Sequence, residues 1–186
     1  MKTALKLLAV AAVFLAPRPS AAQSVAMPET SAGPIAIQES DGELSSEVRL
    51  IVARGDEMTR RLRFDAAAHE YRRAADVARR ENHLASGTTW KAATAYFTDG
   101  NMVAAAGLLD QLADDAALVG DLQVEALSIY YSAWLNAKAG RKLETASRTE
   151  RLEGLLRSQY MPVALRDQLS SWLAIAKTVA SVGETN

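Results

Sequence analysis

The chain of 186 residues contains no cysteine. This absence excludes disulfide bonds, a thiol nucleophile, cysteine-ligated zinc and the lipidated cysteine of a bacterial lipoprotein. Only two histidines occur, and their separation, from His69 to His83, matches no metal-binding motif. A glycine-rich phosphate loop and a serine nucleophile elbow are also missing. We therefore expect no metal, no cofactor and no catalytic centre.

The sequence has no apolar run long enough to span a membrane. Lys2 and Lys6 precede a stretch of ten apolar residues, LLAVAAVFLA, and the small residues Ser20-Ala21-Ala22 follow it. A membrane-spanning helix needs about twenty such residues, whereas this order of charged, apolar and small residues is typical of a secretory signal peptide. We predict that residues 1–22 are cleaved near Ala22, so that the protein works in the periplasm or outside the cell without stable membrane insertion.

Basic charge is not in excess either. Cleavage after Ala22 would take the formal net charge from −1 to −4, because it removes three basic residues and no acid. An acidic chain argues against nucleic acid as the partner. The charge is uneven, however: net +4 over residues 49–80, −5 over 81–139 and +2 over 141–186. Such segregation either steers a partner or supplies ion pairs between neighbouring segments, and the second is the simpler interpretation.

Proline is absent between Glu43 and Met161, whereas residues 23–42 mix proline, glycine, serine and acids without any period. We predict a flexible linker over residues 23–42 and a helical domain over residues 43–183. Four glycines with polar neighbours divide this domain at intervals of 13, 20 and 20, which predicts short helices that end in turns: Gly87, Gly100, Gly120 and Gly140.

Apolar residues in the domain recur at helical spacing, and no alternating run suggests a strand. Phe64, Ala67, Ala68 and Tyr71 follow this template, with arginine and acids on the opposite face. We predict seven helices in an all-α domain, near residues 44–61, 64–81, 88–99, 102–115, 121–139, 142–158 and 162–181.

These helices repeat in pairs. Residues 93–114, ATAYFTDGNMVAAAGLLDQLAD, combine a small residue, an aromatic three later, glycine at the turn, a further small residue and then a large apolar one. This stretch resembles a tetratricopeptide repeat, and residues 64–78 resemble its second helix. The resemblance implies antiparallel helical hairpins stacked as a short right-handed solenoid of about three repeats, with residues 162–181 as a capping helix. The departures are a period of 38–40 instead of roughly 34, the missing prolines, and Thr89 at a position where the family prefers a bulky residue.

The resemblance also implies a binding groove lined by the first helix of each pair. Transferred to this sequence, the groove positions include four aromatics with a basic residue beside them: Trp90, Phe97, Tyr130, Trp134 and Arg60. The aromatics either line this groove or pack between the hairpins. We expect an exported, non-catalytic scaffold or adaptor that binds a protein or peptide of the cell envelope, in an oligomeric state that the sequence does not specify.

Two alternatives remain at this stage. The protein is a permanent accessory subunit of an envelope assembly, or it is an envelope hydrolase that acts on glycan. Paired carboxylates would carry the hydrolase alternative, and the candidates are Asp114-Asp115, Asp56-Glu57 and Glu39, which with Ser40 resembles the start of a lytic transglycosylase motif. Adjacent carboxylates on a helix point in different directions, which is poor geometry for acid–base catalysis.

Overall fold

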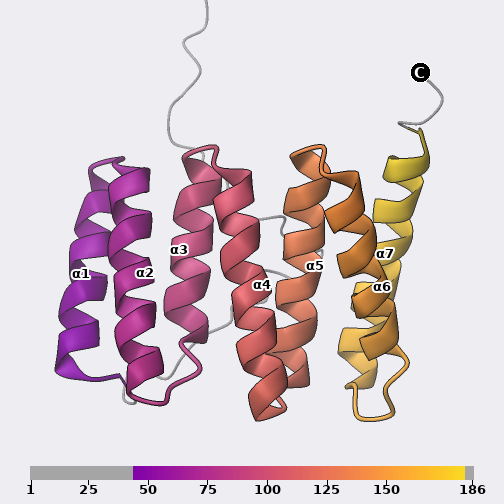
Figure 1. Cartoon of the computed structure of the whole chain (residues 1–186), viewed down its shortest axis with the longest axis horizontal. Helices are drawn as coiled ribbons and strands as arrows, with labels where there is room; N and C mark the ends of the chain where they lie inside the picture. The colour runs from indigo at the N-terminus through magenta and orange to yellow at the C-terminus, as the bar shows by residue number, and fades with distance from the viewer. Residues whose placement is uncertain (1–43, 183–186) are drawn as a thin grey trace, which may run out of the picture.

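The computed structural model describes residues 44–182, with side chains as far as residue 174 (Figure 1). The predicted signal peptide (residues 1–22) and linker (residues 23–42) lie outside the described residues. Residues 44–182 contain no strand and form seven helices: α1 (Ser46–Arg60), α2 (Phe64–Arg80), α3 (Ser86–Thr98), α4 (Met102–Val119), α5 (Leu122–Lys138), α6 (Lys142–Leu156) and α7 (Val163–Val182).

The helices form a row of antiparallel hairpins in which each packs against the next, and α7 closes the row against α5 and α6 (Figure 1). The prediction of an all-α, solenoid-like array is therefore confirmed. Three of the predicted turn glycines take left-handed backbone conformations: Gly100 at φ 88°, Gly120 at 76° and Gly140 at 72°. Asn101 and Asp121, which follow two of these glycines, cap α4 and α5 through their side chains.

Two details of the prediction were wrong. Gly87 lies inside the first turn of α3, which begins at Ser86, and the preceding turn uses Asn82 and Ala85 at φ 65° and 58°. The Ala85 side chain is completely buried, and this packing compensates for a backbone conformation that alanine rarely adopts. The other error is the end of α4, which continues to Val119 because Ala116 is still buried and only Gly120 ends the helix.

Side-chain contacts divide the helices into two rows. In the first-helix row (α1, α3, α5 and α7), Lys91 of α3 reaches Asp56 of α1, and aromatic rings join α3 to α5 and α5 to α7. In the second-helix row (α2, α4 and α6), Arg79 of α2 reaches Asp115 of α4, and Arg148 of α6 reaches α4 in turn. One partner of each hairpin therefore lies in each row.

Small residues allow the helices of a hairpin to approach closely. Ala67, Ala74 and Ala105 are completely buried, as expected for residues at helix crossings. The closest approach is at Gly55 of α1, where a Cβ atom would lie only 2.5 Å from Cε1 of Tyr71 on α2. The first hairpin therefore leaves no room for a side chain at this position.

Candidate functional site

Six aromatic side chains of α3, α5 and α7 make ring contacts across the first-helix row, in one group of four and one pair. We call this set the aromatic face: Trp90, Phe97, Tyr130, Tyr131, Trp134 and Trp172. The ring of Trp90 meets Tyr131 edge-on with the centroids 4.9 Å apart, and Tyr131 lies 5.0 Å from Tyr130. The ring of Tyr130 in turn packs against Trp172 of α7, with the centroids 4.7 Å apart, so the set extends to the last helix.

Phe97 and Trp134 form a second pair within the aromatic face. Their ring centroids are 5.4 Å apart, and Nζ of Lys138 lies 4.8 Å above the centroid of the Trp134 ring. Edge-on and tilted ring pairs of this kind stabilise a packed aromatic set beyond the burial of its area, and the ammonium adds a cation–π contact.

The aromatic face is only partly covered by the protein. Tyr131 is buried, with 2 % of its surface exposed, and the other five members are partly buried against the core. Within residues 44–174, no hydrogen bond uses Oη of Tyr130 or the indole N–H of Trp90, Trp134 or Trp172, and none of these atoms is sealed from solvent. The face therefore presents both ring surface and free donors.

Burial also changes the acidity of the two tyrosines. Desolvation raises the pKa of Tyr130 above its ordinary value, and burial together with the neighbouring charge of Tyr130 raises the pKa of Tyr131 to about 12. Both hydroxyls are therefore neutral at physiological pH, and the phenol of Tyr130 is available as a donor or an acceptor.

The structure thus brings together four of the five residues predicted for the groove. Trp90, Phe97, Tyr130 and Trp134 all belong to the aromatic face, whereas Arg60 lies near the end of α1 and pairs with Glu57 of the same helix. Trp172, which contacts Tyr130, was not among the residues predicted for the groove. Its contact with Tyr130 depends on how α7 packs, which periodicity does not specify.

Thr89 and Trp90 show why the repeat pattern is displaced by one residue. Thr89 is completely buried, and its hydroxyl accepts a hydrogen bond of 3.0 Å from Nη2 of Arg79 on α2. The same guanidinium binds Asp115 of α4 through Nε at 2.7 Å. A polar residue therefore occupies the inward position, and the neighbouring Trp90 turns toward the aromatic face.

A polar cluster at the edge of the first-helix row joins α1, α2 and α3. Oη of Tyr71 donates to Asp56 at 2.7 Å and lies 3.1 Å from the hydroxyl of Thr59, while Lys91 donates to Asp56 at 3.0 Å. Burial, opposed by the hydrogen bond with Thr59 and reinforced by Asp56, raises the pKa of Tyr71 to about 12.

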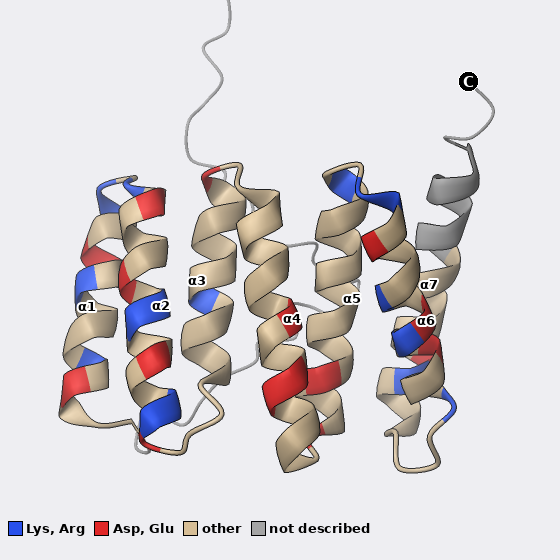
Figure 2. Ribbon diagram, viewed as in Figure 1, with Lys and Arg blue, Asp and Glu red and all other residues tan. Residues whose placement is uncertain are grey.

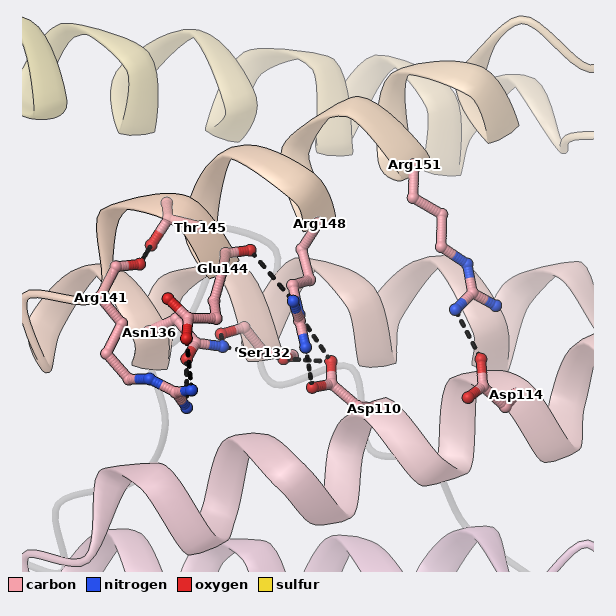
Figure 3. Close-up of polar contacts among 9 residues, drawn as sticks. All are labelled: Asp110, Asp114, Ser132, Asn136, Arg141, Glu144, Thr145, Arg148 and Arg151. Atoms are coloured by element: carbon pink, nitrogen blue, oxygen red, sulfur yellow. Dashed lines mark hydrogen bonds and ion pairs between the residues drawn. The ribbon is translucent and has the colours of Figure 1, made fainter.

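The uneven charge of the sequence supplies ion pairs between hairpins. Figure 2 shows basic residues on α1, α2 and α6 with acidic residues among them, and acidic residues on the lower part of α4. Asp110 of α4 accepts two hydrogen bonds from Arg148 of α6, at 3.1 and 2.6 Å, and another at 2.5 Å from Ser132 of α5 (Figure 3). Arg151 of α6 bridges to Asp114 of α4 at 2.6 Å. These contacts agree with the simpler interpretation of the charge pattern.

The candidate carboxylate pairs are separated by these contacts. Asp114 turns toward Arg151 of α6, whereas Asp115 turns toward Arg79 of α2. Asp56 contacts Lys91, whereas its neighbour Glu57 pairs with Arg60 and Arg61 at the end of its own helix. Glu39 lies outside the described residues. Among the described residues, no group of three acidic or histidine side chains is placed to hold a metal ion.

A second surface feature lies at the opposite end of the helices from the α3–α4 and α5–α6 turns. The α4–α5 turn and the α6–α7 loop enclose a shallow hollow, lined among others by Val119, Leu122 and Tyr160. The apolar residues around it are strongly exposed, with Leu118 at 87 % and Tyr160 at 76 %. We call this surface the apolar end.

Comparison with known proteins identifies no relative: the chain matches no family model, no curated protein and no solved structure. Among the helices of the described part of the chain, none is long and apolar enough to cross a membrane.

Proposed function

We propose that this protein is an exported, non-catalytic scaffold or adaptor with tetratricopeptide-like repeats, and that the aromatic face binds an extended segment of a partner protein. In this proposal the signal peptide is removed near Ala22, and the mature chain works in the periplasm or outside the cell. The observation that carries the proposal is the gathering of all three tryptophans of the chain on one partly exposed face.

The composition of the aromatic face supports a binding role. Tryptophan and tyrosine dominate the residues that contribute most to protein interfaces, because they offer a large rigid surface with a polar edge. On this face, rings of three helices are continuous, and the indole N–H groups of Trp90, Trp134 and Trp172 make no hydrogen bond within residues 44–174. A peptide backbone, which carries a carbonyl acceptor at every residue, matches these donors.

The arrangement of the hairpins supports the tetratricopeptide-like assignment. The first helix of each hairpin lies in the row that carries the aromatic face, and small residues occupy its close contacts, as at Gly55 and Ala93. The longer period accompanies long second helices, since α2 has 17 residues and α4 has 18.

Capture of a partner by the purified mature chain tests the proposal. We expect Trp134→Ala to lose a partner taken from envelope extract while keeping most of its stability, because the ring is only partly buried. Tyr160→Ala is the matched control, since Tyr160 is an exposed aromatic outside the aromatic face. Loss of an interface hot spot weakens binding by about 2 kcal/mol or more. Equal capture by Trp134→Ala and the parent chain would contradict the proposal, and so would unfolding of Trp134→Ala, which would place Trp134 in the core.

The apolar end favours a second candidate, a permanent accessory subunit. Permanent interfaces are more apolar than transient ones, and Leu118, Val119 and Tyr160 expose apolar surface together at one end of the helices. In this case Leu118→Ser combined with Val119→Ser should release a stoichiometric partner, whereas Trp134→Ala should retain it.

A further inference from the structure

We propose that one end of the helical array docks on the surface of a bilayer that contains anionic lipid. The contact is made by apolar side chains at the hairpin turns and by the basic residues around them. We call this surface the basic end; it comprises the α1–α2, α3–α4 and α5–α6 turns, residues 57–65, 99–103 and 138–144. The inference goes beyond the proposed function and does not depend on it.

The three turns of the basic end have the same backbone structure, but the first has leucine where the others have glycine. Leu62, Gly100 and Gly140 occupy the left-handed position, at φ 57°, 88° and 72°. In each turn, the amide of the next residue donates to a carbonyl of the preceding helix: Arg63 to Met58 at 2.9 Å, Asn101 to Tyr96 at 2.8 Å, and Arg141 to Asn136 at 2.9 Å. Glycine is the preferred residue at this position of a helix ending.

Packing does not explain why leucine occupies the first turn. A left-handed conformation is costly for leucine, because its Cβ atom approaches the backbone. At Ala85, the other apolar residue with a positive φ among those described, complete burial of the side chain compensates for this cost. The side chain of Leu62 is instead 65 % exposed. Such an outlier without a structural cause points to a functional role of the exposed side chain.

The other two turns also present a large apolar side chain. Val103, in the first turn of α4, is 50 % exposed, and Leu143, at the same place in α6, is 85 % exposed. The three turns lie at the same end of the array and at nearly the same level (Figure 1). Because these side chains come from three separate hairpins, a flat surface can take up all of them, whereas a pocket of a partner protein fits one. A bilayer offers such a surface, with apolar chains beneath its headgroups.

Basic residues surround the two leucines. Figure 2 shows them at the upper ends of α1 and α2 and of α5 and α6, with acidic residues beside them. The side chains of Arg63 and Lys142 are exposed and make no hydrogen bond or ion pair within residues 44–174. Long basic side chains of this kind bind anionic headgroups while neighbouring apolar side chains enter below them. The basic end holds six basic residues, Arg60, Arg61, Arg63, Lys138, Arg141 and Lys142, and four acids, Glu57, Asp65, Asp99 and Glu144.

Sedimentation with lipid vesicles tests the inference. We expect the mature chain, which retains all described residues, to bind vesicles of equal parts phosphatidylglycerol and phosphatidylcholine but not phosphatidylcholine alone. Added salt should weaken this binding, because it screens exposed charges. Arg63→Gln and Lys142→Gln should each weaken it about fivefold, as expected for one basic residue near an anionic surface. Asp99→Asn should strengthen it, because Asp99 is exposed and no basic partner neutralises it within the described residues.

Leu62→Gly separates a docking role from a structural one. Glycine fits the left-handed position better than leucine, so the urea midpoint of this variant should stay the same or rise. The variant should nevertheless bind the anionic vesicles about tenfold more weakly, because insertion of leucine removes its apolar surface from water. Leu143→Ser should weaken binding in the same way. Leu50→Ser is the matched control, since Leu50 lies near the beginning of α1, is 57 % exposed and should not touch the bilayer.

A fluorophore distinguishes insertion from contact through charge alone. The chain has no cysteine, so Leu62→Cys can carry one environment-sensitive label, whose emission should shift to the blue on the anionic vesicles, whereas a label on Leu50→Cys should not respond. An unshifted label at residue 62, or equal binding by Leu62→Gly, Leu143→Ser and the parent chain, would show a contact of the kind made with an acidic protein and would overturn the inference. It would also be overturned if the parent chain failed to bind the anionic vesicles, or if Leu118→Ser lost binding, which would assign the contact to the apolar end.

Discussion

A substitution at Gly55 tests the packing of the first hairpin most sharply. A Cβ atom at this position would lie 2.5, 2.7 and 2.9 Å from three ring atoms of Tyr71. Since carbon atoms pack at about 3.5–4.0 Å, the ring would have to retreat by about 1 Å. It cannot swing away freely, because its hydroxyl is held by Asp56 at 2.7 Å and lies 3.1 Å from the hydroxyl of Thr59.

The magnitude follows from two opposing effects of Gly55→Ala. Overpacking in a close contact costs about 1–3 kcal/mol, and the anchored ring places this site in the upper half of that range. Alanine is a better helix former than glycine by about 1 kcal/mol. We therefore expect the free energy of unfolding to fall by about 1–2 kcal/mol, measured as a lower urea midpoint with an unchanged slope.

Two other helical glycines provide matched controls. Gly107 of α4 and Gly154 of α6 are exposed, and a Cβ atom on either would have no neighbour within 4 Å. Alanine at these positions should raise the free energy of unfolding by about 0.5–1 kcal/mol. In a Tyr71→Phe background the ring loses its hydroxyl anchors, so the cost of Gly55→Ala should shrink. If Gly55→Ala stabilises the protein as much as the controls do, the close approach of α1 and α2 is refuted.

Three further predictions concern the rest of the described chain. Ala105→Leu, at a completely buried crossing, should lower the free energy of unfolding by about 1–3 kcal/mol, and a loss below about 0.5 kcal/mol in urea would contradict the register of α4. Asp110→Ala removes both hydrogen bonds from Arg148 and should cost about 1.5–3 kcal/mol, whereas an unchanged thermal midpoint would show that this contact contributes nothing. Folding raises the pKa of Tyr71 and Tyr131 from 10.0 to about 12. Their contribution to stability is therefore complete below pH 10 and is lost as the pH rises toward 12. Helix content measured by circular dichroism should fall between about pH 10 and 12 and stay constant below about pH 10.

The helices could be predicted from the sequence because their apolar residues keep a strict helical period. α2 buries Ala67, Ala68 and Tyr71 of the predicted stripe, whose first member Phe64 is only partly buried, and the buried side continues with Ala74, Ala75, Val77 and Ala78. The glycine signals were reliable where the turn needs a left-handed residue, as at Gly100. The signal at Gly87 was misleading, because tertiary packing of Ala85 supplies the left-handed position two residues earlier.

The apolar pattern of the sequence is weak in α6 for a physical reason. This helix buries only Leu152 and Leu156, and it is held to α4 and α5 mainly by Arg148 and Arg151 through charged hydrogen bonds. A pattern of small and large apolar residues at fixed spacing does not predict hydrogen bonds between charged side chains. The partners in the aromatic face were predictable only in part, since the sequence places aromatics on helices but does not give the packing of Trp172 against Tyr130.

The succession of contacts along the array has a consequence for how the molecule opens. Helices that touch mainly their neighbours in sequence form a nearly one-dimensional system, whose stability is a sum of local terms and whose ends unfold first. The most deeply buried helix of this system is α5, which buries eleven residues, whereas the described part of α7 packs mainly against α5 and α6. Amide hydrogens should therefore exchange in a gradient, slowest in α5 and faster toward the last helix. Because Trp172 belongs to α7, unfolding of this last helix would remove one ring from the aromatic face. Any segment that binds across α3 and α7 would therefore stabilise α7 and slow the exchange of its amide hydrogens.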